Sequence, residues 1–268
     1  MLEIFALYLL LGAAAGFVAG LFGIGGGLLI VPVLIFSFTA QGLSPEVLTH
    51  AAVATSLGTI VFTSISSIRA HHANSAVHWN LFPWISAGIL AGALGGVWIA
   101  EMLSGRVLQL AFGCFTLAVA LQMALNLRPS SGGREPGKKE LVVAGGGVGC
   151  ASAVFGIGGG TLTVPYLHWR RLNMPHAVAT SAACGLPIAL VGATGNIVTG
   201  WDEARMPEWS LGYIYLPALL GIVLASTFTA RFGARLAHRL PQRKLKLVFA
   251  LFLAFVGIRF LVTNLLQG

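Results

Sequence analysis

One hexapeptide, Phe-Gly-Ile-Gly-Gly-Gly, occurs twice in this sequence, and each copy interrupts an otherwise apolar stretch. The first copy spans residues 22–27 and precedes Val31-Pro32, and the second spans residues 155–160 and precedes Val164-Pro165. Glycine and proline break helices, because glycine loses much conformational freedom there and proline lacks the N–H that helical bonding needs. The sequence therefore predicts a broken apolar helix at corresponding positions of two similar halves.

The similarity of the halves extends to both sides of the hexapeptide. Upstream, small residues spaced four apart form one closely packing helix face in each half. Downstream, the tetrapeptide Val-Ala-Thr-Ser occurs at residues 53–56 and again at 178–181. We predict a first repeat at residues 1–128, a linker at 129–140 and a second repeat at 141–268. The small residues are Gly12, Gly16 and Gly20 in the first half and Gly145, Gly149 and Ala153 in the second.

The chain has too few charges for a water-soluble protein. Charged residues make up 9% of it and apolar residues 56%, whereas soluble domains carry about 25% charge. This composition predicts an all-α polytopic membrane protein. The net charge of +8 gives no reason to expect nucleic-acid binding, because the Lys and Arg residues fall in short segments between apolar runs.

Each half contains one interrupted apolar stretch and three uninterrupted ones that are long enough to cross a bilayer. If the interrupted stretch crosses once, the basic residues divide almost evenly between the two sides. If it folds back as a hairpin, 13 of the 16 lie on one side, which the positive-inside rule favours. The interrupted stretches are residues 4–38 and 141–168, and the predicted spans are 45–68, 80–102, 106–127, 174–199, 210–231 and 245–265.

The hairpin interpretation makes the halves inverted repeats, each a broken or re-entrant helical hairpin plus three transmembrane helices. The basic side is then cytoplasmic and both termini lie outside, in the periplasm of a bacterium whose inner membrane holds the protein. Only Arg106, Arg205 and Arg259 fall on the outer side. The hairpin arms of the second half are short for the hydrocarbon core, so the glycine tips should lie at depth within the membrane.

Backbone N–H groups at such a tip lack helical partners, and the following helix points its positive end at them. The tips are therefore candidate anion sites, although glycines in membrane helices also serve simply to let helices pack closely. Discontinuous helices in two inverted halves are typical of transporter binding sites. The predicted substrate-binding residues here are Gly25, Gly26, Gly27, Gly158, Gly159, Gly160 and Thr161.

Further candidates follow on the next helix of each half. Thr55 and Ser56 recur as Thr180 and Ser181, and hydroxyls can solvate an anion without holding it tightly. The alternative is that they bond within or between helices. His50 and His176 are candidates for a proton or gating role, with a surface position as the alternative. Arg259 is a candidate anion contact, with snorkelling to the outer interface as the alternative.

The sequence lacks the residues that metal binding, disulfide formation and cation coupling would need. Cys114, Cys150 and Cys184 form no metal or disulfide pattern, so we expect no metal, no cofactor and no enzyme activity. All eight acidic residues lie in predicted loops or at helix ends, so no buried carboxylate indicates cation coupling. Export of a monoanion from a negative cytoplasm is favoured by about 2.3 kcal/mol per 100 mV, which requires no coupling ion.

These features resemble the TauE/SafE family of sulfite and organosulfonate exporters, also called the 4-toluene sulfonate uptake permease family. The matching segments are residues 22–32 and 155–165, the Ala-Thr-Ser triplets, Gly200-Trp201 and residues 233–241. The resemblance implies export of sulfite or an organosulfonate such as sulfoacetate, by alternating access at the paired tips. An anion channel, or an importer of another small sulfur-containing or carboxylate anion, is the alternative. We expect a small anion and the lipid bilayer as partners, and a homo-oligomer stays open.

Overall fold

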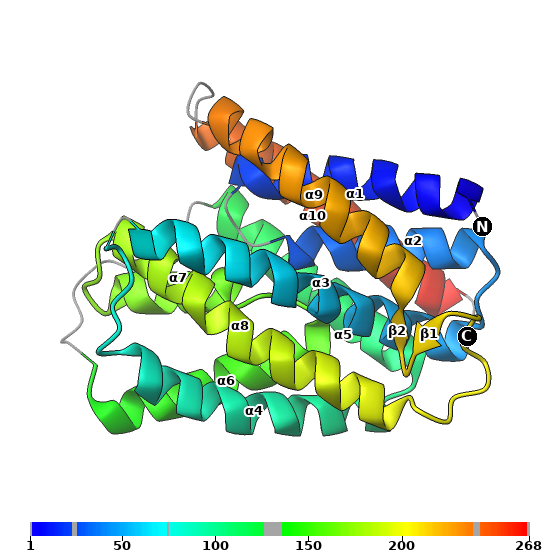
Figure 1. Cartoon of the computed structure of the whole chain (residues 1–268), viewed down its shortest axis with the longest axis horizontal. Helices are drawn as coiled ribbons and strands as arrows, with labels where there is room; N and C mark the ends of the chain where they lie inside the picture. The colour runs from blue at the N-terminus through cyan, green and yellow to red at the C-terminus, as the bar shows by residue number, and fades with distance from the viewer. Residues whose placement is uncertain (1, 23–25, 74, 126–135, 238–241, 267–268) are drawn as a thin grey trace.

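The computed structural model describes residues 2–22, 26–73, 75–125, 136–237 and 242–266, and almost all of them are helical (Figure 1). Each predicted broken stretch forms two helices. The first stretch gives α1 (Leu2–Phe22) and α2 (Gly27–Ala40), and the second gives α6 (Lys138–Phe155) and α7 (Gly160–Trp169). The remaining helices are α3 (Pro45–Ala73), α4 (Phe82–Met102), α5 (Gly105–Ala124), α8 (Met174–Thr199), α9 (Leu216–Ala237) and α10 (Gln242–Leu266).

Within the described residues, six helices are long and apolar enough to cross a membrane: α3, α4, α5, α8, α9 and α10. These correspond to the six uninterrupted spans expected from the sequence. Three of the arms that flank the breaks, α2, α6 and α7, are shorter than these six helices, whereas α1 has 21 residues, as α4 does. At 1.5 Å per residue the ten residues of α7 extend about 15 Å, roughly half of a hydrocarbon core, so α7 is too short to cross.

Three predicted boundaries were wrong. The span expected at 210–231 begins with a two-stranded antiparallel hairpin, β1 (Ser210–Leu211) and β2 (Ile214–Tyr215), and the helix starts only at Leu216. Gly212, with a φ of 56°, lies in the turn that joins the two strands, where glycine adopts the positive φ without steric cost. The third helix of the first half continues to Ala73 rather than 68, and the expected linker 129–140 ends within α6, which begins at Lys138.

The helix directions in Figure 1 are those of a chain that folds back at each break. Both termini lie at the same end of the bundle, next to the β-hairpin, and α1 and α2 have their outer ends there. The end of α3 and the starts of α4 and α6 lie at the opposite end. The division into two inverted repeats stays a prediction.

Close glycine contacts join helices of opposite halves. A Cβ on Gly88 of α4 would overlap the carbonyl oxygen of Val142 in α6, and one on Gly12 of α1 would lie 2.6 Å from Cα of Ile222 in α9. The pairings α4 with α6 and α1 with α9 are the most extensive helix contacts among the described elements. In each, the first helix of one half packs on the fourth helix of the other, so the halves interlock.

Helices α3 and α8 form the centre of the bundle and pack against each other. Every residue of α3 from Val47 to Ile60 is buried, which is typical of a helix enclosed by others on all sides. The helices around them expose apolar side chains, as lipid contact requires. Exposed tryptophans lie near both ends of the bundle, and Lys138 Nζ lies 4.6 Å from the ring centroid of Trp84, an arrangement typical of membrane interfaces.

Candidate functional site

The second glycine tip is a buried reversal of the chain between α6 and α7. Gly156 ends α6 in the left-handed conformation, with a φ of 65°, and its N–H donates to the carbonyl oxygen of Ser152. Ile157 donates to the same carbonyl over 3.0 Å. Gly159 is the N-cap of α7, and residues 156–159 are all buried. Glycine is needed at residue 156 because side chains rarely tolerate this φ.

The first tip is described from Gly26 onward, so the predicted site residue Gly25 lies outside the described residues. Gly26 is the N-cap of α2 with a φ of 57°, and its carbonyl accepts from the N–H groups of Leu29 and Ile30. Gly27 is buried. A Cβ there would lie 2.9 Å from the carbonyl oxygen of Gly156 and 2.9 Å from Cα of Ile157. The two glycine segments, far apart in sequence, are therefore in direct contact.

One hydroxyl of the first half holds the second tip. Ser56 Oγ on α3 donates to the carbonyl oxygen of Gly156 over 2.7 Å, and both groups are buried. A Cβ on Gly156 would lie 2.9 Å from Cα of Val53, one turn earlier on the same helix. The predicted site residue Ser56 thus has a positioning contact: it fixes the second tip against α3.

The two predicted threonines bind backbone groups of the protein. Thr55 Oγ1 accepts from the N–H of Tyr215 over 3.0 Å, and Thr180 Oγ1 accepts from the N–H of His78 over 3.0 Å. Both threonines are fully buried. Tyr215 precedes α9 and His78 precedes α4, so each threonine anchors the segment that leads into a helix. This is the structural alternative that the sequence left open for these hydroxyls.

Other hydroxyls near the second tip have no partner among the described residues. They are Thr161 and Thr163 at the start of α7, Ser181 on α8 and Ser152 on α6. Thr163, Ser181 and Ser152 are essentially inaccessible. Thr161 and Ser181 were predicted as site residues, whereas Thr163 and Ser152 were not. The sequence does contain a signal for Thr163, because the two hexapeptides are followed by different residues. Thr161 and Thr163 follow the second hexapeptide at the positions where Leu28 and Ile30 follow the first.

Unpaired backbone donors accompany these hydroxyls. In the described part of the chain, the N–H groups of residues 158–161 have no hydrogen-bond acceptor, since the first bonds of α7 run from Leu162 and Thr163 to the carbonyl of Gly159. Gly158 and Gly159 are buried and Gly160 and Thr161 are half-buried, and buried backbone donors are rarely left unpaired in proteins. The predicted residues Gly158, Gly159, Gly160 and Thr161 therefore supply consecutive donors at a helix N-terminus, where the helix dipole favours negative charge.

The two predicted histidines occupy opposite ends of the central helices. His50 Nε2 lies 3.0 Å from the carbonyl oxygen of Ala100, and its ring stacks on Tyr213 at 5.4 Å between centroids. His176 Nδ1 lies 2.7 Å from the carbonyl oxygen of Ala76, and its ring meets His78 edge-on at 4.6 Å. His50 is buried rather than at the surface. His50 thus contacts the end of α4, and His176 contacts the segment between α3 and α4.

Arg259 is exposed on α10, and its Nη1 donates to Thr263 Oγ1 over 2.9 Å. Thr263 lies one turn toward the C-terminal end, so the guanidinium extends toward that end of the bundle. This geometry is that of a snorkelling side chain. The contact does not link Arg259 to either glycine tip.

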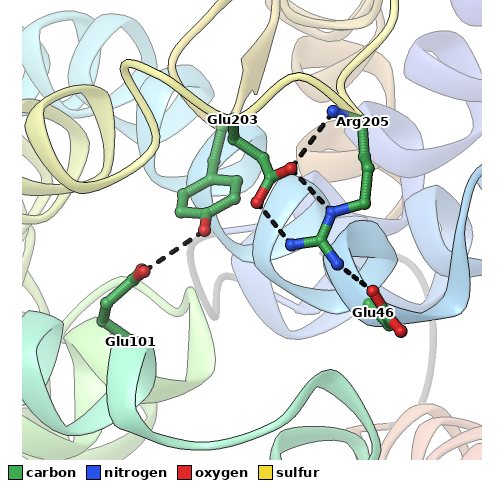
Figure 2. A network of polar contacts seen from close by, with 5 residues as sticks. Glu46, Glu101, Glu203 and Arg205 are labelled. Carbon is green, nitrogen blue, oxygen red and sulfur yellow. Dashed lines mark hydrogen bonds and ion pairs between the residues drawn. The ribbon is translucent and has the colours of Figure 1, made fainter.

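A polar network closes the end of the bundle that holds both termini (Figure 2). Arg205, in the segment between α8 and β1, forms ion pairs with Glu203 and with Glu46 at the start of α3. Tyr213 donates to Glu101 at the end of α4 over 3.3 Å. Burial and the nearby Glu101 carboxylate raise the pKa of Tyr213 to about 12, so its hydroxyl keeps its proton. These contacts tie the segment before α9 to two helices of the first half.

The fold and the site define a polytopic helical membrane protein with paired helix breaks that meet in its interior. The family model described as "Sulfite exporter TauE/SafE" matches residues 8–260. The chain therefore belongs to the TauE/SafE sulfite exporter family and is a multi-pass membrane transporter.

Two relatives match this chain over nearly its whole length. A "Probable membrane transporter protein" of Haemophilus influenzae is 39% identical, over 96% of this chain and 98% of its own length. The "Probable membrane transporter protein MJ0441" of Methanocaldococcus jannaschii is 27% identical, over 94% of this chain and 93% of its own. Both names are those of transporters and not of enzymes. No solved structure gives a significant match.

Proposed function

We propose that this transporter exports a small anion with a sulfur oxyanion head, either sulfite or an organosulfonate such as sulfoacetate. The observation that carries the proposal is the run of unpaired N–H groups at residues 158–161, at a helix N-terminus inside the bundle. Membership of the sulfite exporter family supports the substrate class. An anion at this tip would give the orphan donors the acceptors that they lack.

Neutral donors suit a substrate that must leave again. The described polar groups around the second tip are hydroxyls and backbone N–H groups, and the described carboxylates and cationic groups lie in loops or toward helix ends. A buried fixed cation would bind an anion much more tightly and slow its release. The tip can therefore replace part of the anion's hydration shell and still exchange it.

The proposed direction is outward. Among the described acidic residues, none lies in the buried centre of a spanning helix, where a cation-coupled pump usually carries a carboxylate. An inside-negative potential favours exit of a monoanion by about 2.3 kcal/mol per 100 mV. Uncoupled export thus needs no further group, whereas concentrative uptake would.

The proposed mechanism is alternating access between two inverted repeats, residues 1–128 and 141–268. The interlocked pairs α4 with α6 and α1 with α9 support it, because a two-fold relation exchanges one pair for the other. The distribution of basic residues supports a cytoplasmic side opposite the termini in a bacterial inner membrane. Gly27 of the first half contacts the second tip, so residues of both halves border the proposed anion site.

The test is flux in proteoliposomes under an imposed potassium diffusion potential. We expect saturable sulfite or sulfoacetate flux that increases when the substrate-containing side is made negative. The Gly159→Ala variant should lose it, because a Cβ there would lie 3.1 Å from both Thr163 Oγ1 and Ile188 Cδ1. Gly147→Ala, at an exposed position with open space, is the matched control. Flux no greater than in empty vesicles would refute the proposal, and flux without saturation would indicate a channel.

A further inference from the structure

We propose that the two glycine tips have different tasks: the second binds the oxyanion head, and the first only supports it. Thr163 is then the hydroxyl that selects the substrate. This inference rests on the proposed anion transport and names the part of the site that recognises the anion. It predicts preference for a head with three oxygens over a carboxylate of equal charge.

The tips share their glycines but differ in the residues that follow. After the second hexapeptide, Thr161 and Thr163 flank Leu162, whereas after the first, Leu28 and Ile30 flank Leu29. Leu28 and Ile30 are buried in the hydrophobic core, and neither side chain can donate a hydrogen bond. A polar ligand therefore finds side-chain donors at the second tip alone among the described residues.

Thr163 is positioned at the N-terminus of α7. Its backbone N–H is already used, because it donates to the carbonyl oxygen of Gly159 over 2.7 Å. Its hydroxyl is fully buried and has no partner in the described structure. The hydroxyl oxygen lies 3.1 Å from the place that a Cβ on Gly159 would occupy. It therefore borders the position where the N-cap residue lacks a side chain, next to the unpaired N–H groups.

Ser181 on α8 has a hydroxyl available to a ligand, whereas the hydroxyl of its counterpart Ser56 is already used. Ser56 is committed to the carbonyl of Gly156, whereas Ser181 Oγ is buried and unpartnered among the described residues. The Ser181 carbonyl oxygen lies 3.6 Å from the Cβ position of Gly159, so this turn of α8 borders the same N-cap. The two Val-Ala-Thr-Ser segments thus divide between support and recognition.

The donor set favours a particular head group. The second tip offers backbone N–H groups of residues 158–161 and the hydroxyls of Thr161, Thr163 and Ser181, all of them neutral. A sulfite or sulfonate head presents three oxygens in a pyramid, whereas a carboxylate presents two in a plane. More donors are therefore satisfied by the three-oxygen head, and each donor left unpaired in a buried site opposes binding.

The experiment compares Thr163→Val and Thr161→Val with Thr116→Val as the matched control. Thr116 is also buried, but its hydroxyl donates only within α5, to the carbonyl of Gly113. Flux of sulfite and sulfoacetate is measured in proteoliposomes, with malonate and acetate as carboxylate competitors. Thermal unfolding in detergent is measured with and without sulfite, methanesulfonate or acetate.

We expect Thr163→Val to raise the KM for sulfite about tenfold or more, as loss of a hydrogen bond to a charged group implies. The larger rise in melting temperature with methanesulfonate than with acetate should shrink in Thr163→Val. The Thr116→Val variant should keep both the wild-type KM and this difference in melting temperature. Without anion, Thr163→Val should melt at the same or a higher temperature than the wild type, because it removes an unsatisfied buried hydroxyl. A residue needed only for packing would instead lower the melting temperature.

The outcomes separate the two proposals. If the wild type transports sulfite and Thr163→Val transports it with unchanged KM and selectivity, this inference is overturned and the proposed function stands. If the wild type transports neither sulfite nor sulfoacetate, the proposed function fails. In that case the thermal measurement decides this inference: it survives only if methanesulfonate raises the wild-type melting temperature and the Thr163→Val variant loses that shift.

Discussion

Ser56, on the third helix of the first half, donates its hydroxyl hydrogen bond to the carbonyl oxygen of Gly156, at the tip between α6 and α7 of the second half, over 2.7 Å. The bond joins one half's central helix to the other half's broken one. It therefore makes the position of the second tip depend on α3. If α3 moves relative to α6 and α7, this hydrogen bond must break or the second tip must move with α3.

Replacing Ser56 by Ala should destabilise the protein by about 1–3 kcal/mol, because it leaves the buried carbonyl of Gly156 without its donor. The measurement is thermal unfolding in detergent, followed by tryptophan fluorescence. Ser66→Ala, at an exposed position of the same helix, should behave like the wild type. Equal melting temperatures for all three proteins would contradict the positioning role.

Alanine at residue 156 should be far more damaging than alanine at residue 147 of the same helix. Gly156 has a φ of 65°, and its Cβ would meet backbone atoms of Val53, so neither strain nor clash can be relieved by a rotamer change. The left-handed conformation alone costs about 1–2 kcal/mol in a residue with a side chain. Gly147 has open space, and alanine there should be neutral or stabilising by up to about 1 kcal/mol. Similar yields of folded protein for both variants would argue against the described turn.

The interlocked packing of the halves predicts that two glycines of α4 differ in how well they tolerate alanine. Gly88→Ala should reduce stability by several kcal/mol, since its Cβ would overlap the backbone of α6 and two helix backbones must then move apart. Gly95→Ala, on the same helix with no atom within 4 Å, should leave stability unchanged. Size-exclusion profiles and melting temperatures of the two variants distinguish them. A tolerated Gly88→Leu substitution would show that α4 and α6 are not in contact.

Ionisation of Tyr213 should lower the stability of the folded protein at alkaline pH. Its pKa is raised to about 12 in the folded protein, chiefly by burial and then by Glu101, from an ordinary value of about 10. Its contribution is therefore complete below pH 10 and is lost as the pH rises from about 10 to about 12. Between pH 10 and pH 12 the wild type should lose more stability than Tyr213→Phe, measured as melting temperature against pH. Parallel curves for the two proteins would exclude this role.

Much of the architecture followed from the sequence because it depends on local chemistry. The charge deficit required a membrane protein, and the length of the apolar runs gave the six spans. The repeated Gly-Ile-Gly-Gly-Gly located both helix breaks, whereas the prolines that follow it, Pro32 and Pro165, lie inside α2 and α7 and break neither helix. Boundaries that depend on a turn were missed, such as the β-hairpin at Gly212, because apolar composition continues through it.

The sequence by itself determined that the chain is a helical membrane transporter of the TauE/SafE family with two broken helices. Only the tertiary structure decided what each hydroxyl does. Ser56 and Ser181 stand in identical Val-Ala-Thr-Ser segments, yet one is bonded to Gly156 and the other is unpartnered among the described residues. The reason is physical: a buried hydroxyl bonds to whatever group another helix brings within about 3 Å of it. Its own neighbours in the sequence do not contain that information.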